Sequence, residues 1–417
     1  QRVTLSSADP GAQIRYTLDG SEPTAQSPAY GDPILVEGRG GQRNVYSLIP
    51  TSRTFYTPAD GEVYKATVLR AAAFADGKLS SPVTTHSYFI DPDAERLYRG
   101  VPVASVVADP PQLFSQDSPR GIEVFGPSPG NAPWYPGANW WLDREVPASL
   151  ELFAPDRSTL LRADFGAQIS GGYSRNNAQK NLDVIFRDPY GVRSVTAPLF
   201  PNRGYSKFKR FRLRASGQEY GRSHIRDILA HDLFRQGSPL DFADYAPAVA
   251  FLDGEYWGFI QLREKTTGDF LGQVHGVDDG AVDIIDIAVT PLSQVDHVEV
   301  RDGTRLAWDA LRAYVAAHAA ELQSDLGLIE ALFDTENLTN WFAANQFMNN
   351  IDWPTNNVRA WRPREQDGRW RFILHDDDFT FGMSGTAESS LYKVIGNTSK
   401  IGSMMGILMK NPDFRTL

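Results

Sequence analysis

The spacing of apolar residues changes along this 417-residue chain, and the change limits the folds that the chain can adopt. Up to about residue 265, short stretches alternate apolar and polar residues between turn residues, which is typical of β-strands. From about residue 302 to 350 the apolar residues instead follow helical spacing, as at Leu306, Leu311, Tyr314 and Val315. The sequence therefore predicts an α+β fold in which a strand-rich part precedes a helical part.

The first 92 residues have a strand pattern of their own and predict an all-β domain. The expected strands are Gln13–Leu18, Tyr64–Phe74 and Val83–Ile90, with turns at Asp19-Gly20-Ser21 and Asp76-Gly77. Strands at this spacing in about 90 residues are typical of a β-sandwich. Because the pattern changes at Asp91-Pro92, we expect two domains, 1–92 and 93–417, that fold independently.

Composition excludes several classes of protein. The chain has no cysteine, so it holds neither a disulfide framework nor a thiolate metal site. Its net charge of −10 argues against a nucleic-acid partner, since binding phosphate backbones needs a basic face. No apolar run reaches the roughly 18 residues that a membrane-spanning helix needs. The chain begins with Gln1, and we expect that a signal sequence has been removed.

A single helix is expected inside the strand-rich part, from Ser223 to Gln236. Ser223 is the predicted N-cap and Gly237 the predicted stop. The face predicted to pack in the core carries Ile225, Ile228, Leu229, Leu233 and Phe234. The seven histidines, two of which lie in this helix, form no metal-binding pattern, and no catalytic histidine is expected.

The strongest functional signal lies between residues 341 and 382. Asp352 follows a helix, and Pro354 disfavours helix at the preceding residue, so Asp352 is expected on a loop. Asn357 lies five residues later, and a predicted hairpin then leads into Asp376, Asp377 and Asp378. Oxygen ligands of this kind suit Mg²⁺. The order also matches a protein-kinase catalytic segment, in which one Asp takes the hydroxyl proton while a later Asn and Asp bind metal.

Other interpretations of this segment stay open. Asp352 can cap a turn, the asparagines can be loop residues, and three aspartates can form a solvated turn or a calcium site. A metal-dependent hydrolase could use the same cluster. Three adjacent carboxylates repel one another by roughly 1 kcal/mol or more per close pair, which favours a nearby cation.

Two further segments have weaker signals. Gly171-Gly172, followed by Ser174, Arg175 and Lys180, would let backbone N–H groups and a lysine reach a phosphate, although a plain hairpin turn fits equally. Asp253-Gly254 predicts a β-hairpin. In a kinase-like fold the segment after such a hairpin, Leu262–Lys265, would border the adenine of ATP.

The chain resembles two known families. Ile14–Thr24, with Ser27, Tyr30, Leu69-Arg70-Ala71 and Ser81-Pro82-Val83, resembles the chitobiase/β-hexosaminidase C-terminal-type domain, a fibronectin type III-like sandwich. Most of 100–417 resembles the CotH family of atypical, spore-coat-type secretory kinases. That second resemblance rests on an ordered set of segments: Gly166–Arg175 with Lys180, Leu213-Arg214, Ile225-Arg226-Asp227, Gly254–Gly258, Leu262–Lys265, Asp352-Trp353-Pro354 with Asn357, and Trp370–Asp378.

The CotH resemblance implies an atypical protein-kinase-like domain that uses ATP and a divalent metal, Mg²⁺ or Mn²⁺/Ca²⁺, to phosphorylate Ser or Thr of a protein substrate. The implied roles are catalysis by Asp352, nucleotide binding by Lys180, Arg175, Ser174, Leu262 and Glu264, and metal binding by Asn357, Asp376 and Asp378. Asp376 and Asp378 are preferred to Asp377 because residues two apart on an extended chain share a face.

The same resemblances imply where the protein acts. They are typical of a secreted or cell-surface bacterial protein whose N-terminal domain contacts carbohydrate or a surface matrix. The alternative is a non-catalytic surface protein that retains the kinase-like fold.

Overall fold

The computed structural model describes residues 1–52, 61–90, 98–115, 121, 138–290, 293–383 and 400–417. The chain divides into two compact units, each built from two segments. The first contains 1–215 and 245–263, and the second contains 216–244 and 264–417. The boundary expected at residue 92 lies inside the first unit and stays a prediction.

The N-terminal part of the first unit is a β domain, as the sequence predicts. Its long central strand β4 (Thr67–Ala75) pairs antiparallel with β2 (Gln13–Thr17), β5 (Lys78–Leu79) and β6 (Thr84–Tyr88). A two-stranded ribbon, β1 (Arg2–Val3) with β3 (Ile34–Leu35), and a 3₁₀ turn, η1 (Tyr46–Leu48), complete it. Asp76 and Gly77 both have positive φ, and they form the turn predicted between β4 and β5.

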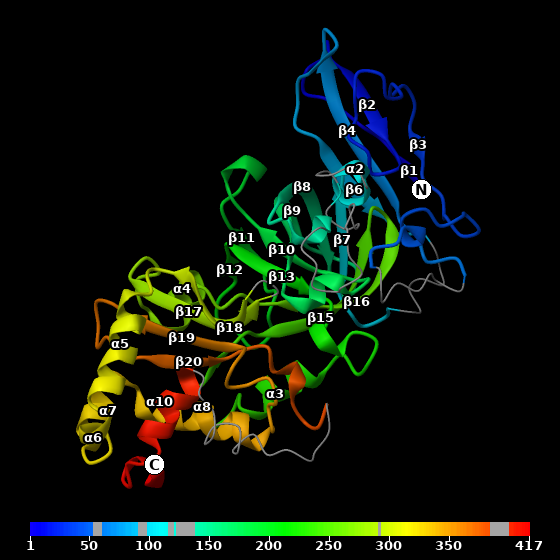
Figure 1. The fold of residues 1–417 in the computed structure, drawn as a ribbon. Coiled ribbons are helices and arrows are strands. Elements are labelled where there is room, and N and C mark those ends of the chain that lie inside the picture. The colour runs from blue at the N-terminus through cyan, green and yellow to red at the C-terminus, as the bar shows by residue number, and fades with distance from the viewer. Residues whose placement is uncertain (53–60, 91–97, 116–120, 122–137, 291–292, 384–399) are drawn as a thin grey trace. The chain divides into compact units, whose positions relative to one another are not determined.

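A closed seven-stranded barrel forms the rest of the first unit (Figure 1). The order of its strands is β10 (Asn181–Ile185), β13 (Arg210–Arg214), β16 (Glu255–Arg263), β15 (Tyr245–Leu252), β7 (Val103–Ala108), β8 (Glu145–Phe153) and β9 (Thr159–Ser170). All neighbours are antiparallel except β7 and β15, which are parallel. Alternate residues fill the interior, such as Val146, Ala148, Leu150 and Leu152 of β8. The short elements around the barrel are α2 (Pro110–Phe114), η2 (Asn139–Trp141), η3 (Tyr173–Asn176), η4 (Asp188–Tyr190), β11 (Val195–Thr196) and β12 (Lys207–Phe208).

The second unit is a five-stranded sheet with helices. The strand order is β14 (Asp241–Phe242), β20 (Arg371–Leu374), β19 (Val358–Pro363), β17 (Val282–Thr290) and β18 (Ser293–Asp302). The sequence analysis predicts the β19–β20 hairpin but misses β17 and β18. The helices are η5 (Gly217–Glu219), α3 (Arg226–Leu233), α4 (Gly268–His275), α5 (Leu306–Ala317), α6 (Ala319–Leu322), α7 (Leu326–Leu332), α8 (Thr335–Phe347), η6 (Asp377–Phe379), α10 (Lys400–Leu408) and η7 (Phe414–Thr416).

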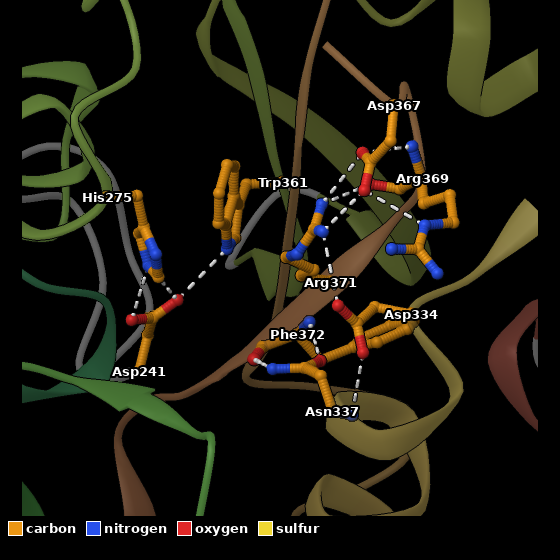
Figure 2. Close-up of polar contacts among 9 residues, drawn as sticks. All are labelled: Asp241, His275, Asp334, Asn337, Trp361, Asp367, Arg369, Arg371 and Phe372. Atoms are coloured by element: carbon orange, nitrogen blue, oxygen red, sulfur yellow. Dashed lines mark hydrogen bonds and ion pairs between the residues drawn. The ribbon is translucent and has the colours of Figure 1, made fainter.

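Helix α8 is fastened to strand β20 by one side chain. The amide of Asn337 accepts from the Phe372 backbone N–H at 2.6 Å and donates to the Phe372 carbonyl at 3.1 Å (Figure 2). Buried rings of Trp341 and Phe372 stack beside this contact, with centroids 4.4 Å apart. These contacts hold the first part of α8 against β20, and the chain after each of these elements leads into a segment predicted to carry chemistry.

Helix α3 confirms the predicted helix but corrects its orientation and its start. Ile228 is buried as predicted, but Ile225, Leu229 and Leu233, also expected in the core, are 50 %, 44 % and 49 % exposed. Asp227 and His231 are buried in their place. The polar residues face inward because they form hydrogen bonds with the segment around η6. Ser223 is not the N-cap, since its hydroxyl donates to the Glu219 carboxylate.

Candidate functional site

The loop between α8 and β19 holds the carboxylate predicted to be catalytic. Oδ2 of Asp352 accepts from Nδ2 of Asn356 at 2.6 Å and from Nδ2 of Asn357 at 2.8 Å. The same Asn357 amide donates to the carbonyl of Asp376 at 3.2 Å. The β19–β20 pairing explains this closeness, because Asn357 directly precedes β19 and Asp376 lies two residues beyond the end of β20. The structure thus brings together Asp352, Asn357 and Asp376.

The three aspartates after β20 lie on a turn and not on an extended chain. Asp376 has φ 58° and ψ 56°, and residues 377–379 form η6. The argument that Asp376 and Asp378 share a face of a strand is therefore wrong, because the chain reverses between them. Asp376 is half-buried, whereas Asp378 is buried and its Oδ2 accepts from the Gln218 backbone N–H at 2.8 Å. Their proposed metal-binding roles stay predictions.

Asp377 serves as a junction between three segments. Its Oδ2 lies 3.0 Å from Nε2 of His231, and its Oδ1 accepts from Nδ2 of Asn350 at 3.1 Å. Its backbone N–H donates to Oδ1 of Asp227 at 2.8 Å. Burial raises the pKa of the Asp377 carboxyl, and His231 opposes that rise. These contacts tie Asp377 to helix α3 and to the loop that holds Asp352.

Neither Asp227 nor His231 is a predicted site residue, although Asp227 lies in a segment that carries the CotH resemblance. Ligand atoms of these two residues and Asp377 all lie within 4.8 Å of one another, and all three residues are buried. Such a group could hold a metal ion, although its atoms already exchange hydrogen bonds. The available signal was the spacing of Asp227 and His231, which lie four apart and therefore share a helix face.

A second polar contact fixes the chain beyond η6. Glu219 is buried and accepts from Nε of Arg226 at 3.0 Å, while NH1 of Arg226 donates to the carbonyls of Thr380 and Phe381. Burial alone would raise the pKa of Glu219, but hydrogen bonds from Ser223 and Arg226 hold it below its usual range. Helix α3 therefore supports η6 at its start and at its end.

In the first unit, Lys180 lies among backbone carbonyls. Its ammonium donates to the carbonyls of Thr51 at 2.6 Å, Arg175 at 2.8 Å and Asn177 at 3.0 Å, and lies 4.0 Å from the ring centre of Trp140. An ammonium has three N–H donors, so these three carbonyls match its capacity. Lys180 is 4 % exposed and has a structural role in this state, and its phosphate-binding role stays a prediction.

The remaining predicted nucleotide residues have separate surroundings. Arg175 donates to the carbonyls of Gly171 and Trp140 and to Asp143, and Ser174 accepts from the amide of Asn181. Leu262 lies in the barrel interior. In the second unit, Glu264 accepts from the Asp244 backbone N–H at 3.0 Å. The described contacts bring Arg175 and Lys180 together in one loop, Gly171–Lys180, which also contains Ser174.

Comparison with known proteins identifies the class of both parts. Residues 3–88 match the family described as Fn3 associated, a class of β domain. Residues 167–417 match the family described as CotH kinase protein, and this match covers more than half of the chain. The chain therefore belongs to the CotH kinase family, as its sequence motifs indicate. No curated protein matches the chain. Among the residues described by the structure, no helix is long and apolar enough to cross a membrane.

Proposed function

We propose that this protein is an ATP- and divalent-metal-dependent kinase that phosphorylates Ser or Thr of secreted or surface proteins. The observation that carries the proposal is the Asn357 amide, which binds Asp352 and the backbone of Asp376 at once. One side chain thereby joins the expected hydroxyl-orienting carboxylate to the expected metal segment. Phosphoryl transfer depends on such positioning more than on covalent chemistry by the protein.

The donor atoms near η6 fit a hard divalent cation. Carboxylates of Asp376 and Asp378, with the side-chain oxygen of Asn357, would hold Mg²⁺, which favours one or two carboxylates together with phosphate oxygens. ATP would supply the phosphoryl group, and the bound metal would neutralise its charge. Asp352 would orient the acceptor hydroxyl and take its proton.

A non-catalytic surface protein with a kinase-like fold remains the second candidate. One observation favours it: the ammonium of Lys180 already donates to three backbone carbonyls. Phosphate binding by Lys180 would require this loop to exchange at least one of these hydrogen bonds. In that case the Fn3-associated domain, whose resemblance is to modules of extracellular bacterial proteins, would carry the surface or carbohydrate contact.

The deciding experiment measures transfer from γ-labelled ATP, with Mg²⁺ or Mn²⁺, to the protein itself and to a generic Ser/Thr acceptor. Asp352→Asn should reduce transfer about 10²–10⁴-fold, the usual effect of losing a general base. Asp325→Asn is the matched control, because Asp325 is the exposed N-cap of α7 and Asn caps equally well. Transfer by Asp352→Asn at the wild-type rate would reject the assigned role. No transfer by the wild-type protein would favour the non-catalytic candidate.

A further inference from the structure

The segment expected to bind metal is a turn with an uncommon backbone conformation at its start. Asp376 stands in the left-handed region, which a non-glycine residue rarely adopts without support from its surroundings. Asp378 is the middle residue of η6, the turn that follows. Asp377 lies between them, so any group that holds the Asp377 side chain also sets the directions of both neighbouring carboxylates.

His231 is the group best placed to hold Asp377. Both side chains are 1–2 % exposed, and Nε2 of His231 lies 3.0 Å from Oδ2 of Asp377. The imidazole is itself confined: its ring centre lies 5.6 Å from that of Phe242, and Nδ1 lies 3.4 Å from the Ala243 carbonyl. A buried carboxylate depends on its hydrogen-bond partners because it has lost its contact with water, and His231, like Asn350, supplies such a partner to Asp377.

The other contacts of Asp377 extend the connection to the catalytic loop. Asn350, which donates to Oδ1 of Asp377, also accepts with its own side chain from the Asp352 backbone N–H at 3.2 Å. Asp227 accepts from the Asp377 backbone N–H. One carboxylate is therefore linked to helix α3 on one side and to the Asp352 loop on the other.

We propose that His231 is a positioning residue that acts through Asp377 to hold Asp376 and Asp378 in the arrangement that binds the divalent metal. The inference rests on the proposed function and adds a residue to it. In this proposal His231 acts from behind the metal ligands and is not itself a ligand. Residues that orient metal ligands from behind typically change metal affinity by about 10–100-fold when they are replaced.

The test measures Mn²⁺ binding to the full chain by electron paramagnetic resonance, with a non-hydrolysable ATP analogue present. His231→Leu removes the donor and should weaken Mn²⁺ binding about 10–100-fold. His231→Gln keeps an N–H near the position of Nε2 and should bind Mn²⁺ within about threefold of wild type. If His231 only packed against apolar neighbours, a hydrogen-bond donor would not be needed at this position. Normal Mn²⁺ affinity in His231→Gln but not in His231→Leu would therefore indicate that the donor matters.

Asp377→Asn keeps the test decisive if His231→Leu does not fold. Its Oδ1 can still accept from Asn350, and its Nδ2 can donate to a neutral His231. We therefore expect Asp377→Asn to bind Mn²⁺ with nearly unchanged affinity. If Asp377 were itself a metal ligand, the same substitution would strongly weaken Mn²⁺ binding.

His275→Leu is the matched control. His275 lies 2.8 and 3.0 Å from the two carboxylate oxygens of Asp241, so it forms a second His–Asp pair in the same unit, between helix α4 and strand β14 (Figure 2). Its loss should leave Mn²⁺ affinity unchanged. Unchanged affinity in His231→Leu, or full loss in His231→Gln or Asp377→Asn, would overturn the inference alone. Wild-type protein that binds no Mn²⁺ would overturn the proposed function together with it.

Discussion

The buried carboxylates of Asp286 and Asp253 have pKa values shifted in opposite directions. Burial alone would raise the pKa of Asp286, but the charge and hydrogen bonds of Arg359, aided by Arg301, hold it far below its usual range. Asp253 is equally buried, and burial raises the pKa of its carboxyl well above the usual value. Its Oδ1 accepts from the Ala108 backbone N–H at 2.9 Å. The difference lies in the neighbours: two guanidinium groups bind Asp286, whereas Asp19 and Asp109 add to the rise at Asp253.

Asp253→Asn should therefore change how stability depends on pH. A folded-state pKa above the unfolded value means that Asp253 destabilises the fold progressively as pH rises from the unfolded pKa towards the folded pKa. Between these two pKa values, the free energy of unfolding of the variant should rise relative to that of wild type by up to about 1.4 kcal/mol per pH unit. Denaturant unfolding at several pH values from 4 to 7 measures the difference. Parallel curves for the two proteins would show that Asp253 keeps an ordinary pKa.

For individual residues of the candidate site, the sequence predicted some contacts and missed others. The meeting of Asp352, Asn357 and Asp376 followed from their order around a hairpin, since hairpin geometry is local. The pair of His231 and Asp377 did not, because its members lie 146 residues apart and no local pattern joins them. A buried histidine reveals its partner only when the tertiary structure is known.

Among the elements, the Gly171–Lys180 loop yields the clearest prediction. Lys180→Met keeps most of the length of the side chain and removes the ammonium, which leaves three buried carbonyls without their donor. Stability should fall by about 1–3 kcal/mol whatever the function of Lys180. Thermal melts with and without ATP–Mg²⁺ separate the two roles. A nucleotide-dependent rise in Tm that is lost in the variant indicates phosphate binding, and a rise that persists indicates a structural role alone.

Elements with local signals were predicted best. Asp253-Gly254 gave the β15–β16 hairpin, and the turn at 367–368 gave the β19–β20 hairpin. The closure of the barrel was not predicted, because the parallel pairing of β7 with β15 leaves no signal in either strand. The core face of helix α3 was predicted correctly only at Ile228, because polar residues of this helix have buried partners, which hydrophobic spacing does not take into account.

For the whole molecule, the described contacts argue against the independent folding that the sequence pattern indicates. Buried Glu255 accepts from the Val45 and Ser47 backbone N–H groups at 2.6 and 2.8 Å, and buried Glu151 accepts from the Ser87 N–H at 2.6 Å. Deleting residues 1–92 would leave these carboxylates, and one donor of Lys180, without those partners. Such losses cost about 1–3 kcal/mol each.

Residues 93–417 expressed alone should therefore be insoluble or melt far below the full chain. Solubility and thermal melting under the same conditions provide the measurement, with the full chain as reference. A cooperative melt within a few degrees of the full chain would instead support an independent module with its boundary near residue 92. Because the N-terminal part supplies backbone donors and not only surface contacts, we expect the first outcome.

The parallel pairing of β7 with β15 has a consequence for synthesis of the chain on the ribosome. About 140 residues separate the end of β7 from the start of β15, so at 5–20 residues per second the barrel waits roughly 7–30 s for its closing strand. During that time β7 presents an open edge to other nascent chains and to chaperones. Chains arrested at residue 220 should be cut by protease within β7 and β8, whereas chains arrested at residue 320 should resist. Equal resistance at both lengths would mean that the strands are protected before the ring closes.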